Sequence, residues 1–303
     1  MGVKVYSTYY EDNVIVKDVK NCGSLDFLMP CNHQEADSRL FLHLFDASER
    51  QGHRKALIKT VDSDVPVIAI GVFKSLKLEE LYIEMGTSRA EVKIIPIHEV
   101  VNTLGPEKSA ALPLFHSFTG CDSTPSFFGI GKKTAWGIWE SFPELTGTLN
   151  ELTQNPELFS PVSVHMEQLE RFVVLLYSKG SGCSKVNEAR KMLFSHGKRL
   201  LDGIPPTQDA LYQHIRRSLL QAAFIWGKCL HPEQYIPDVT EWGWTNESGR
   251  LVPFWTVLAD VSQACSLLIH CNCTKSCTRN CKCSKASLHC TSVCKCEGGC
   301  INC

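Results

Sequence analysis

The sequence lacks an excess of charge of either sign. Its 303 residues carry 31 lysines and arginines against 32 aspartates and glutamates, so the formal net charge is −1. This balance excludes a chain that binds nucleic acid along its whole length, and any such binding must come from local basic patches. A content of 44% hydrophobic and 21% charged residues is typical of a globular chain, here long enough for more than one domain.

Long apolar runs are also missing. The stretch 65–73 is far shorter than the roughly 20 residues that cross a bilayer. The first residues, Met-Gly-Val-Lys-Val-Tyr-Ser, have neither the pattern of a secretory signal nor the hydroxyl residue that a myristoylation motif requires. We therefore expect no membrane partner, while the oligomeric state stays open.

Cysteine is scarce over most of the chain and concentrated at its end. Of 16 cysteines, ten lie between Cys271 and Cys303. The other six are expected to be buried free thiols: Cys22, Cys31, Cys121, Cys183, Cys229 and Cys265. Since no secretory signal is seen, the cluster indicates metal thiolates in a reducing compartment, in preference to a disulfide knot or a disordered tail.

Strand and helix patterns alternate over the first part of the chain. A hairpin is expected at 3–19, strands at 56–61, 81–85 and 92–97, and helices at 34–51, from residue 64, at 98–104 and at 107–118. This order predicts an α/β fold with a mostly parallel sheet and helices on both faces. Helical patterns at 164–179, 186–201 and 209–229 predict an α-helical extension after it. The last of these follows Pro205-Pro206-Thr207, a helix breaker followed by a candidate cap.

A glycine turn opens the predicted helix that ends near residue 142. Gly129 and Gly131 allow the backbone to bend sharply and expose consecutive N–H groups, to which the helix adds its positive N-terminus. Such a turn can hold a backbone phosphate without contacting a base. Lys132 and Lys133 would then contact phosphate, the alternative being a solvated start of the helix.

Five acidic residues stand at positions suited to a metal site. Glu35 and Asp37 open a helix, Asp62 and Asp64 follow a strand, and Asp122 lies on a glycine turn. Strand ends are where α/β sheets place their sites, and divalent metals that hydrolyse phosphodiesters need several converging carboxylates. Taken singly, each acid has a structural alternative as a cap or a turn residue; together they favour one shared site.

The order of these motifs resembles the flap endonuclease/XPG-like nucleases over residues 33–142. Residues 120–122 (Gly-Cys-Asp) and 129–135 (Gly-Ile-Gly-Lys-Lys-Thr-Ala) look like that family's helix-turn-helix hallmark, and 33–37 and 60–64 look like its acidic motifs. The resemblance implies a PIN-like core, a catalytic site for Mg²⁺ or Mn²⁺ built from the five acids, and DNA as partner. The family carries two more metal-binding aspartates upstream, which these residues do not match, so DNA binding without cleavage is the alternative.

The C-terminal cysteines follow a regular pattern of Cys-x-Cys pairs and single cysteines. They resemble the CXC domain of tesmin-like proteins, in which nine thiolates hold three zinc ions. Tetrahedral zinc takes four ligands, so nine thiolates suffice only if three are shared. The resemblance implies these zinc ligands: Cys271, Cys273, Cys277, Cys281, Cys283, Cys290, Cys294, Cys296 and Cys300. Cys303 is left over.

The cysteine module also has a locally basic surface suited to a nucleic-acid backbone. It carries Lys275, Arg279, Lys282 and Lys285. We expect three parts: a PIN-like core at 1–142 that lacks the family's N-terminal portion, an α-helical extension at 143–265 and a CXC zinc module at 266–303. The leading hypothesis is a nuclear DNA-cleaving protein; a non-catalytic DNA-binding protein and a structural scaffold are its rivals.

Overall fold

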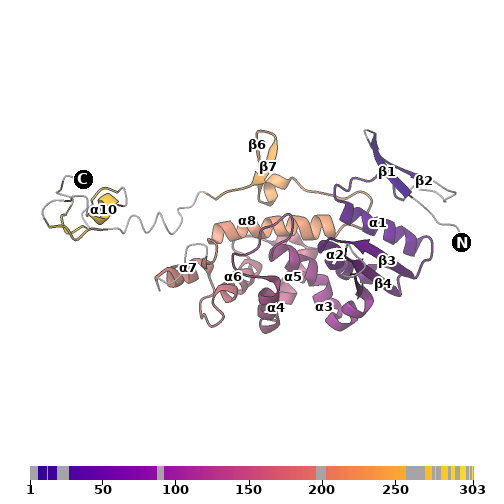
Figure 1. The fold of residues 1–303 in the computed structure, drawn as a ribbon, viewed down its shortest axis with the longest axis horizontal. Helices are drawn as coiled ribbons and strands as arrows, with labels where there is room; N and C mark the ends of the chain where they lie inside the picture. Colours follow the sequence, from indigo (N-terminus) through magenta and orange to yellow (C-terminus); the bar gives the residue numbers. More distant parts are fainter. Residues whose placement is uncertain are drawn as a thin grey trace.

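The computed structural model describes residues 27–86, 92–195 and 203–256, and the backbone of 6–11 and 13–18. Within 270–302 it describes all but 275–276, 278–280, 286–287, 291–293, 298–299 and 301. The expected N-terminal hairpin is present as the antiparallel pair β1 (Tyr6–Glu11) and β2 (Asn13–Asp18) (Figure 1).

The sheet of the main body has three strands in the order β3-β4-β5. β3 (Lys55–Thr60) and β4 (Glu80–Met85) are parallel, joined across α2 (Asp64–Val72) and a short 3-10 turn, η1 (Phe73–Ser75). β5 (Lys93–Pro96) is antiparallel to β4. The expectation of a mostly parallel sheet is therefore wrong: the 86–92 connection is too short for the crossover of a dozen or more residues that a parallel pair requires.

The two faces of this sheet differ in their surroundings. Ile58 and Ile83 are neighbours in register and lie buried against the helices. On the opposite face Leu57 is 52% exposed and Lys59 forms an ion pair with Glu84 at 3.0 Å. Within the described residues, helices thus cover one face of the sheet, where the sequence pattern predicted both.

Helices make up most of the body. They are α1 (Ala36–Glu49), α3 (Ile97–Phe118), α4 (Lys132–Ser141), α5 (Leu145–Gln154), α6 (Val164–Tyr177), α7 (Val186–Ser195), α8 (Gln208–Leu219) and the π-helix η4 (Leu220–Trp226) that continues α8. α3 contains the predicted break, because Gly105 adopts φ 77° between its two helical halves. The cap predicted for α8 is confirmed: the Thr207 hydroxyl accepts the Ala210 N–H at 3.2 Å.

Two elements escape the sequence pattern. α5 buries Leu145, Leu149 and Leu152 on one side, but its many threonines and its glycine mask the helical signal. The sequence pattern also did not predict the short hairpin of β6 (Trp244–Glu247) and β7 (Arg250–Pro253). Its strands are too short for a clear alternation. The body contains two further 3-10 turns, η2 (Pro156–Leu158) and η5 (Val239–Trp242).

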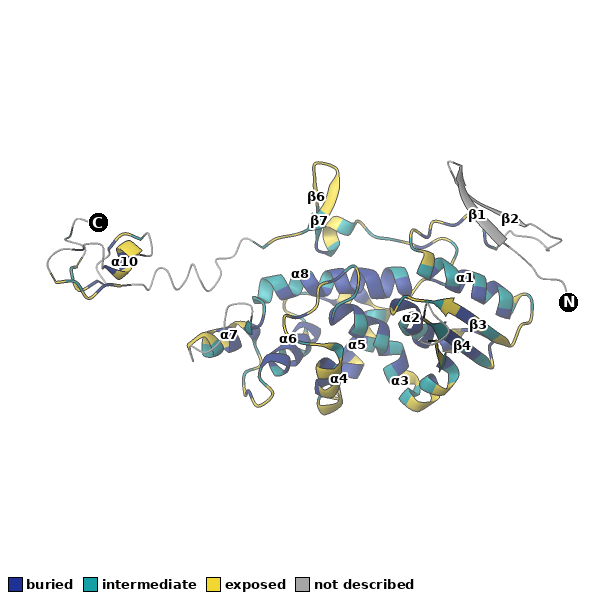
Figure 2. Ribbon diagram, viewed as in Figure 1, coloured by how far each residue is buried: buried dark blue, intermediate teal, exposed yellow. Residues whose placement is uncertain are grey.

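One hydrophobic core unites the sheet with the helical extension. A single cluster of buried side chains runs from Phe41 to Cys229 and includes Trp139, Phe172 and Trp226. Figure 2 shows the buried residues concentrated between α8 and the helices beneath it, whereas the β6–β7 hairpin is largely exposed. The extension therefore helps to fix the geometry of residues that belong to the sheet.

Candidate functional site

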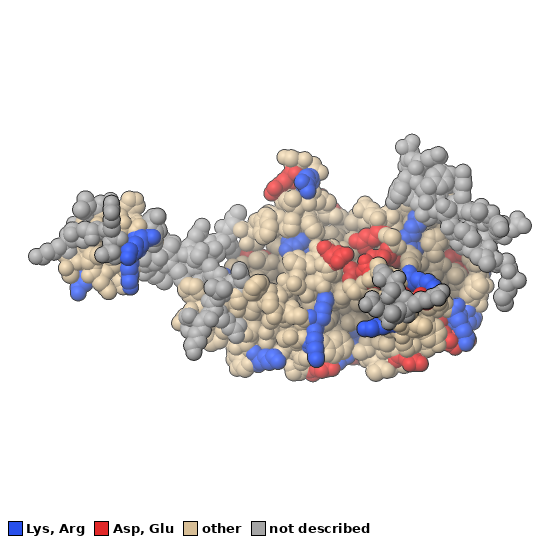
Figure 3. Space-filling view, viewed as in Figure 1, with Lys and Arg blue, Asp and Glu red and all other residues tan. Residues whose placement is uncertain are grey.

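Four carboxylates from three separate stretches of the chain act on the charge of Asp37. Burial raises the pKa of Asp37 above its usual value, and the charges of Asp62, Glu35, Asp64 and Asp122 each raise it further, in that order. The other four predicted acids therefore lie close enough to Asp37 for their charges to act on it. Figure 3 shows acidic side chains gathered on this face over the region where α1, α2 and α8 meet.

Glu35 is held by a residue from the far end of the body. It stands immediately before α1, yet its side chain makes no capping hydrogen bond there. Instead the Gln221 amide nitrogen donates to both Glu35 carboxylate oxygens, at 3.0 and 3.1 Å. Gln221 lies in η4, and π-helical turns are rare and frequent at functional sites. The side chain of Glu35 therefore does not cap α1.

Asp62 and Asp64 are positioned by the tight connection between β3 and α2. The Asp62 N–H donates to the Thr60 hydroxyl at 3.0 Å, and the Asp62 carboxylate accepts the Asp64 N–H at 2.8 Å. Asp62 thus serves as a turn residue while its charge still faces Asp37. Asp64 begins α2 and is only 7% exposed, so its carboxylate points away from bulk water.

The buried Asp64 carboxylate is paired with a histidine of α3. Asp64 Oδ1 lies 2.9 Å from His116 Nε2, and both side chains are largely buried. His116 is therefore the partner of Asp64. A carboxylate fixed in this way keeps one oxygen engaged and presents the other in a defined direction.

Lys132 is half-buried, and its ammonium is turned toward the C-terminal end of α3. Its ammonium donates to the His116 carbonyl and, at 2.9 Å, to the Thr119 hydroxyl, both at the C-terminal end of α3. Burial lowers the pKa of Lys132 to about 8, against the opposing influence of Cys121 and Asp64. The predicted phosphate contact does not fit this orientation, because the ammonium is engaged within the loop.

The other predicted residues of the glycine turn are exposed. Gly129, Gly131 and Lys133 are exposed, and Gly131 immediately precedes α4. Upstream, Cys121 and Thr124 form an isolated β-bridge that turns the chain back on itself. Asp122 sits exposed at the tip of that turn, close enough to influence Asp37.

The carboxylate oxygens of the five acids are suitable ligands for Mg²⁺, but they are not packed closely together. Carboxylate oxygens are the hard ligands that Mg²⁺ prefers, and Mg²⁺ keeps several waters that lengthen the reach between ligands. In the part of the chain that the structure describes, however, only cysteines form groups of ligand atoms that all lie within 4.8 Å of one another. The acids therefore fit a hydrated ion better than a closed cage.

The C-terminal cysteines form a compact set of sulfurs able to hold metal. Neighbouring sulfur atoms lie 3.6 to 3.9 Å apart. These separations are far too long for disulfides, whose sulfurs are about 2.05 Å apart. They match the edge of a tetrahedron with zinc at about 2.3 Å from each sulfur, an edge of roughly 3.8 Å. Within the described residues none of the nine predicted ligands forms a disulfide, and all nine belong to this cluster.

Several of these sulfurs are shared between candidate ligand groups. Three sets of four cysteines each bring their sulfurs within 4.8 Å, and Cys271 belongs to all three. Cys277, Cys281 and Cys290 each belong to two. Sharing of this kind is what a multinuclear thiolate cluster needs.

The environment of the thiols varies across the cluster. Backbone N–H groups, that of Ser284 foremost, lower the pKa of Cys281 to about 6. Burial foremost raises the pKa of Cys283 to about 12. The pKa values of Cys273, Cys277 and Cys290 are raised as well, so these thiols, unlike Cys281, resist ionisation until a metal ion offsets their charge.

The basic residues of this module are described only in part. Lys282 and Lys285 lie exposed on the short helix α10 (Lys282–Lys285), and Lys295 is exposed nearby. Lys275, Arg279 and Cys303 lie outside the described residues, so the predictions for them stay predictions.

Sequence reasoning missed the residues that hold the acids in place. Gln221 lies within an apolar helical run and His116 pairs with a residue 52 positions away. A polar residue in the middle of the run 218–226 was the one available signal, since a buried amide needs a partner.

No described helix has the length and apolar character needed to span a membrane. Comparison of the chain with family models, with curated proteins and with solved structures finds no match.

Proposed function

We propose that this protein is a divalent-metal-dependent nuclease that acts on DNA, with a zinc module that helps to hold the substrate. The observation that carries the proposal is the convergence of Glu35, Asp37, Asp62, Asp64 and Asp122 from three stretches of sequence. Like charges around Asp37 repel it, and a bound cation is the simplest reason for a fold to keep them near one another.

Some residues of the site would bind such a cation, and others hold those ligands in position. Gln221 fixes Glu35, and His116 fixes Asp64, so these two carboxylates are oriented before any ligand arrives. Asp122 is exposed and completes the group from the glycine turn. Mg²⁺ or Mn²⁺ bound there would orient a phosphodiester, activate water and stabilise the leaving oxygen.

The proposed DNA contacts lie beside this group. Gly129 and Gly131 expose backbone at the start of α4, and the neighbouring Lys133 is free to meet a phosphate. Lys132 supports the turn from within. The β3–α2–β4 unit, with acids at the end of β3, agrees with the PIN-like fold that the sequence motifs suggest.

The zinc module would add affinity that does not depend on sequence. We propose that its nine thiolates hold three zinc ions with shared sulfurs, and that exposed Lys282, Lys285 and Lys295 face the DNA backbone. A protein of this kind would work in the nucleus.

A second candidate is a DNA-binding protein without catalysis, built on a degenerate nuclease fold. The open spacing of the carboxylate oxygens favours it, since the described acids form no group within 4.8 Å. The sequence motifs also favour a protein without catalysis, because the upstream aspartates of the nuclease family have no counterpart in these residues.

The test is cleavage of branched and single-stranded DNA in Mg²⁺ or Mn²⁺, comparing the wild type with Asp122→Asn and Asp64→Ala. Asp122→Asn is the sharper variant because the side chain is exposed and the change preserves its shape. We expect the rate to fall by at least 100-fold, the usual effect of removing a group that stabilises the transition state. Glu157→Gln, an exposed acid outside the group, is the matched control.

Unchanged cleavage by Asp122→Asn would show that Asp122 is not part of the catalytic site. Absence of cleavage by the wild type, with DNA still bound, would select the non-catalytic alternative.

A further inference from the structure

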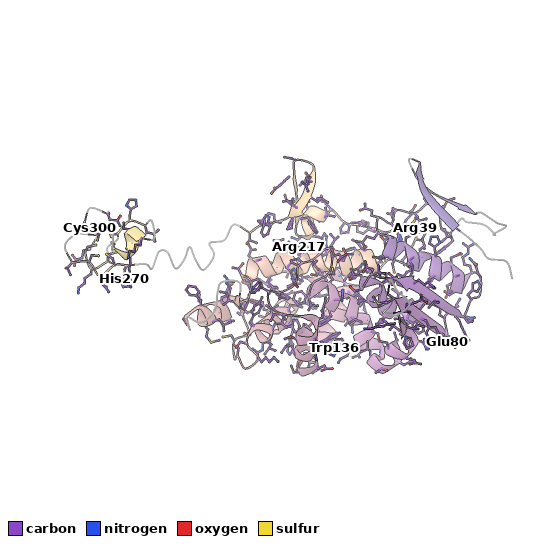
Figure 4. All side chains as sticks on the ribbon, in the orientation of Figure 1. Arg39, Glu80, Trp136, Arg217, His270 and Cys300 are labelled. Carbon is purple, nitrogen blue, oxygen red and sulfur yellow. The ribbon has the colours of Figure 1, made fainter. Side chains whose placement is uncertain are left out.

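Asn302 folds back onto one sulfur of the cysteine cluster. It follows shortly after Cys300, which Figure 4 labels in the C-terminal module. Its side-chain nitrogen donates to the Cys290 sulfur at 3.4 Å, and its main-chain carbonyl accepts the Cys290 N–H at 2.8 Å. A residue near the end of the described chain therefore contacts Cys290 through both its main chain and its side chain.

A further hydrogen bond fixes which atom of the Asn302 amide meets the sulfur. The same nitrogen, Nδ2, donates to the Leu288 carbonyl at 3.0 Å. Because a carbonyl oxygen only accepts hydrogen bonds, this position requires the nitrogen of the amide and not its oxygen. The second N–H of that nitrogen is then directed at the Cys290 sulfur.

Cys290 is a sulfur for which such a donor has consequences. It is only 6% exposed, so water has little access to it. It belongs to two of the three groups of cysteines whose sulfurs lie within 4.8 Å of one another, and the Cys277 sulfur is 3.6 Å away. A thiolate shared by two zinc ions keeps one lone pair, which can accept a charge-assisted hydrogen bond from a neighbouring N–H.

The cluster as proposed carries more negative than positive charge. Three zinc ions supply six positive charges, whereas nine thiolates supply nine negative ones. N–H donors directed at the sulfurs stabilise this excess, and hydrogen bonds of this kind orient metal ligands and tune how firmly they bind.

We propose that Asn302 is a positioning residue of the zinc cluster, and that its side-chain N–H bonds the Cys290 thiolate and slows the loss of zinc. The inference rests on the proposed function in one respect, that the cysteines hold zinc. It depends on neither DNA cleavage nor DNA binding. It adds to the site a side chain that is not itself a metal ligand and that follows the last of the predicted ligands.

The first experiment measures how fast the full, zinc-loaded chain gives up zinc to the chromophoric chelator pyridylazoresorcinol. Asn302→Ala removes the donor, and Asn302→Asp replaces it with a carboxylate oxygen that repels the thiolate. The main-chain hydrogen bond from Cys290 to residue 302 is available in both variants. We expect roughly ten-fold faster release from Asn302→Ala and a larger acceleration from Asn302→Asp, since losing a hydrogen bond to a metal ligand typically costs about 10- to 100-fold in metal affinity.

A spectroscopic measurement separates the N–H···S bond from a merely structural role. When Co²⁺ replaces zinc in the full chain, the thiolates give a charge-transfer band whose energy depends on the electron density at sulfur. Loss of the N–H should move this band to longer wavelength in Asn302→Ala, because the sulfur lone pair is then less stabilised. The visible bands that report tetrahedral geometry should stay unchanged.

Asn272→Ala and Asn272→Asp are the matched controls. Asn272 is an exposed asparagine of the same module, next to Cys271, so its variants make the same chemical changes at the surface. They should release zinc at close to the wild-type rate with unchanged cobalt bands. An equal acceleration in the Asn272 variants would overturn the specific role of Asn302.

The outcomes separate this inference from the proposed function. Wild-type release rates in both Asn302 variants would overturn the inference even though the module holds zinc. Faster release with an unshifted charge-transfer band would overturn it as well, since that result describes only a weaker anchoring of residue 302. A wild-type chain that holds no zinc would overturn the proposed zinc module and this inference together. Faster release with the shifted band would support the inference whether or not DNA is cleaved.

Discussion

The side chain of Lys132 connects the glycine turn to the end of α3. Its ammonium bonds the His116 carbonyl and the Thr119 hydroxyl, while the His116 ring bonds Asp64. One lysine therefore links the candidate metal site to the candidate phosphate site through two residues of a single helix. This link explains why Lys132, which resembles a phosphate contact in the sequence, instead bonds the C-terminal end of α3.

The lowered pKa of Lys132 gives this link a pH dependence. Between about pH 8 and the ordinary lysine value of 10.5, the unfolded lysine holds a proton that the folded one has lost. The unfolded state then binds more protons, so the free energy of unfolding contributed by this residue rises with pH across that window.

We predict that Lys132→Met changes stability in a pH-dependent way. Removing the ammonium leaves two acceptors at the end of α3 without their donor, which costs about 1 kcal/mol at neutral pH. The difference in free energy of unfolding between wild type and variant should widen from pH 8 to pH 10, because the variant lacks the titrating group. Urea unfolding at several pH values measures it.

Lys133→Met is the matched control, because Lys133 is the exposed neighbour and should show no such widening. If wild type and Lys132→Met follow parallel curves over this pH range, the buried position of the ammonium is wrong.

At the scale of elements, the loop at 119–131 depends on a close approach of two backbone segments. Gly120 has φ 114°, and a Cβ at this position would lie 2.8 Å from the Ser126 backbone. Both the dihedral angle and the space therefore require glycine. The same packing sets the direction in which Asp122 points.

We predict opposite effects for two glycine-to-alanine changes on either side of this turn. Gly120→Ala should destabilise the protein by about 2 kcal/mol or more, through backbone strain and steric overlap. Gly137→Ala in the middle of α4, where a Cβ meets nothing within 4 Å, should stabilise it by about 0.5–1 kcal/mol. Thermal or urea unfolding of both variants compares them directly, and equal stability of the two would contradict the described loop.

The elements were largely predictable because their signals are local. The apolar spacing of α1, the Gly105 break in α3 and the Thr207 cap of α8 depend on residues within a few positions of one another. The antiparallel direction of β5 was not predictable from its own sequence, since a strand pattern does not specify its partner. The length of the 86–92 connection was the available clue.

The candidate site was predictable in its charged residues and not in their supports. The acids and the glycine turn stand out as short motifs, whereas the pairing of Glu35 with Gln221 and of Asp64 with His116 depends on tertiary packing. No pattern within a short window encodes contacts over such separations. For the same reason the sequence showed Lys132 as a charge but not the direction of its side chain.

At the scale of the whole molecule, two parts are stabilised by different physics. The body relies on one apolar core from Phe41 to Cys229, whereas the buried residues of the C-terminal module are all cysteines among the described residues. A segment without an apolar core folds only when metal binding supplies the free energy.

We predict that strong chelation unfolds the module and leaves the body intact. Zinc should be released, three ions per chain under the proposed arrangement, while the helical circular dichroism and the melting temperature of the body change little. Metal analysis and circular dichroism before and after chelation measure both effects.

Cys271→Ser should lower the zinc content most among single cysteine variants, because this sulfur belongs to all three ligand groups. Cys183→Ser, a thiol of the body, is the control and should leave the zinc content unchanged. Full zinc content in Cys271→Ser would contradict the shared role of this sulfur.

The hydrogen bond between Gln221 and Glu35 has a consequence for the timing of biosynthesis. The two residues are 186 positions apart, so the ribosome completes the sheet and most of the helices before Gln221 exists. Until then Glu35 lacks the amide that orients it, although the other acids are already present. The nascent chain therefore acquires an oriented acidic site only once the last long helix of the body has emerged and docked, which delays any activity of that site until the body is fully made.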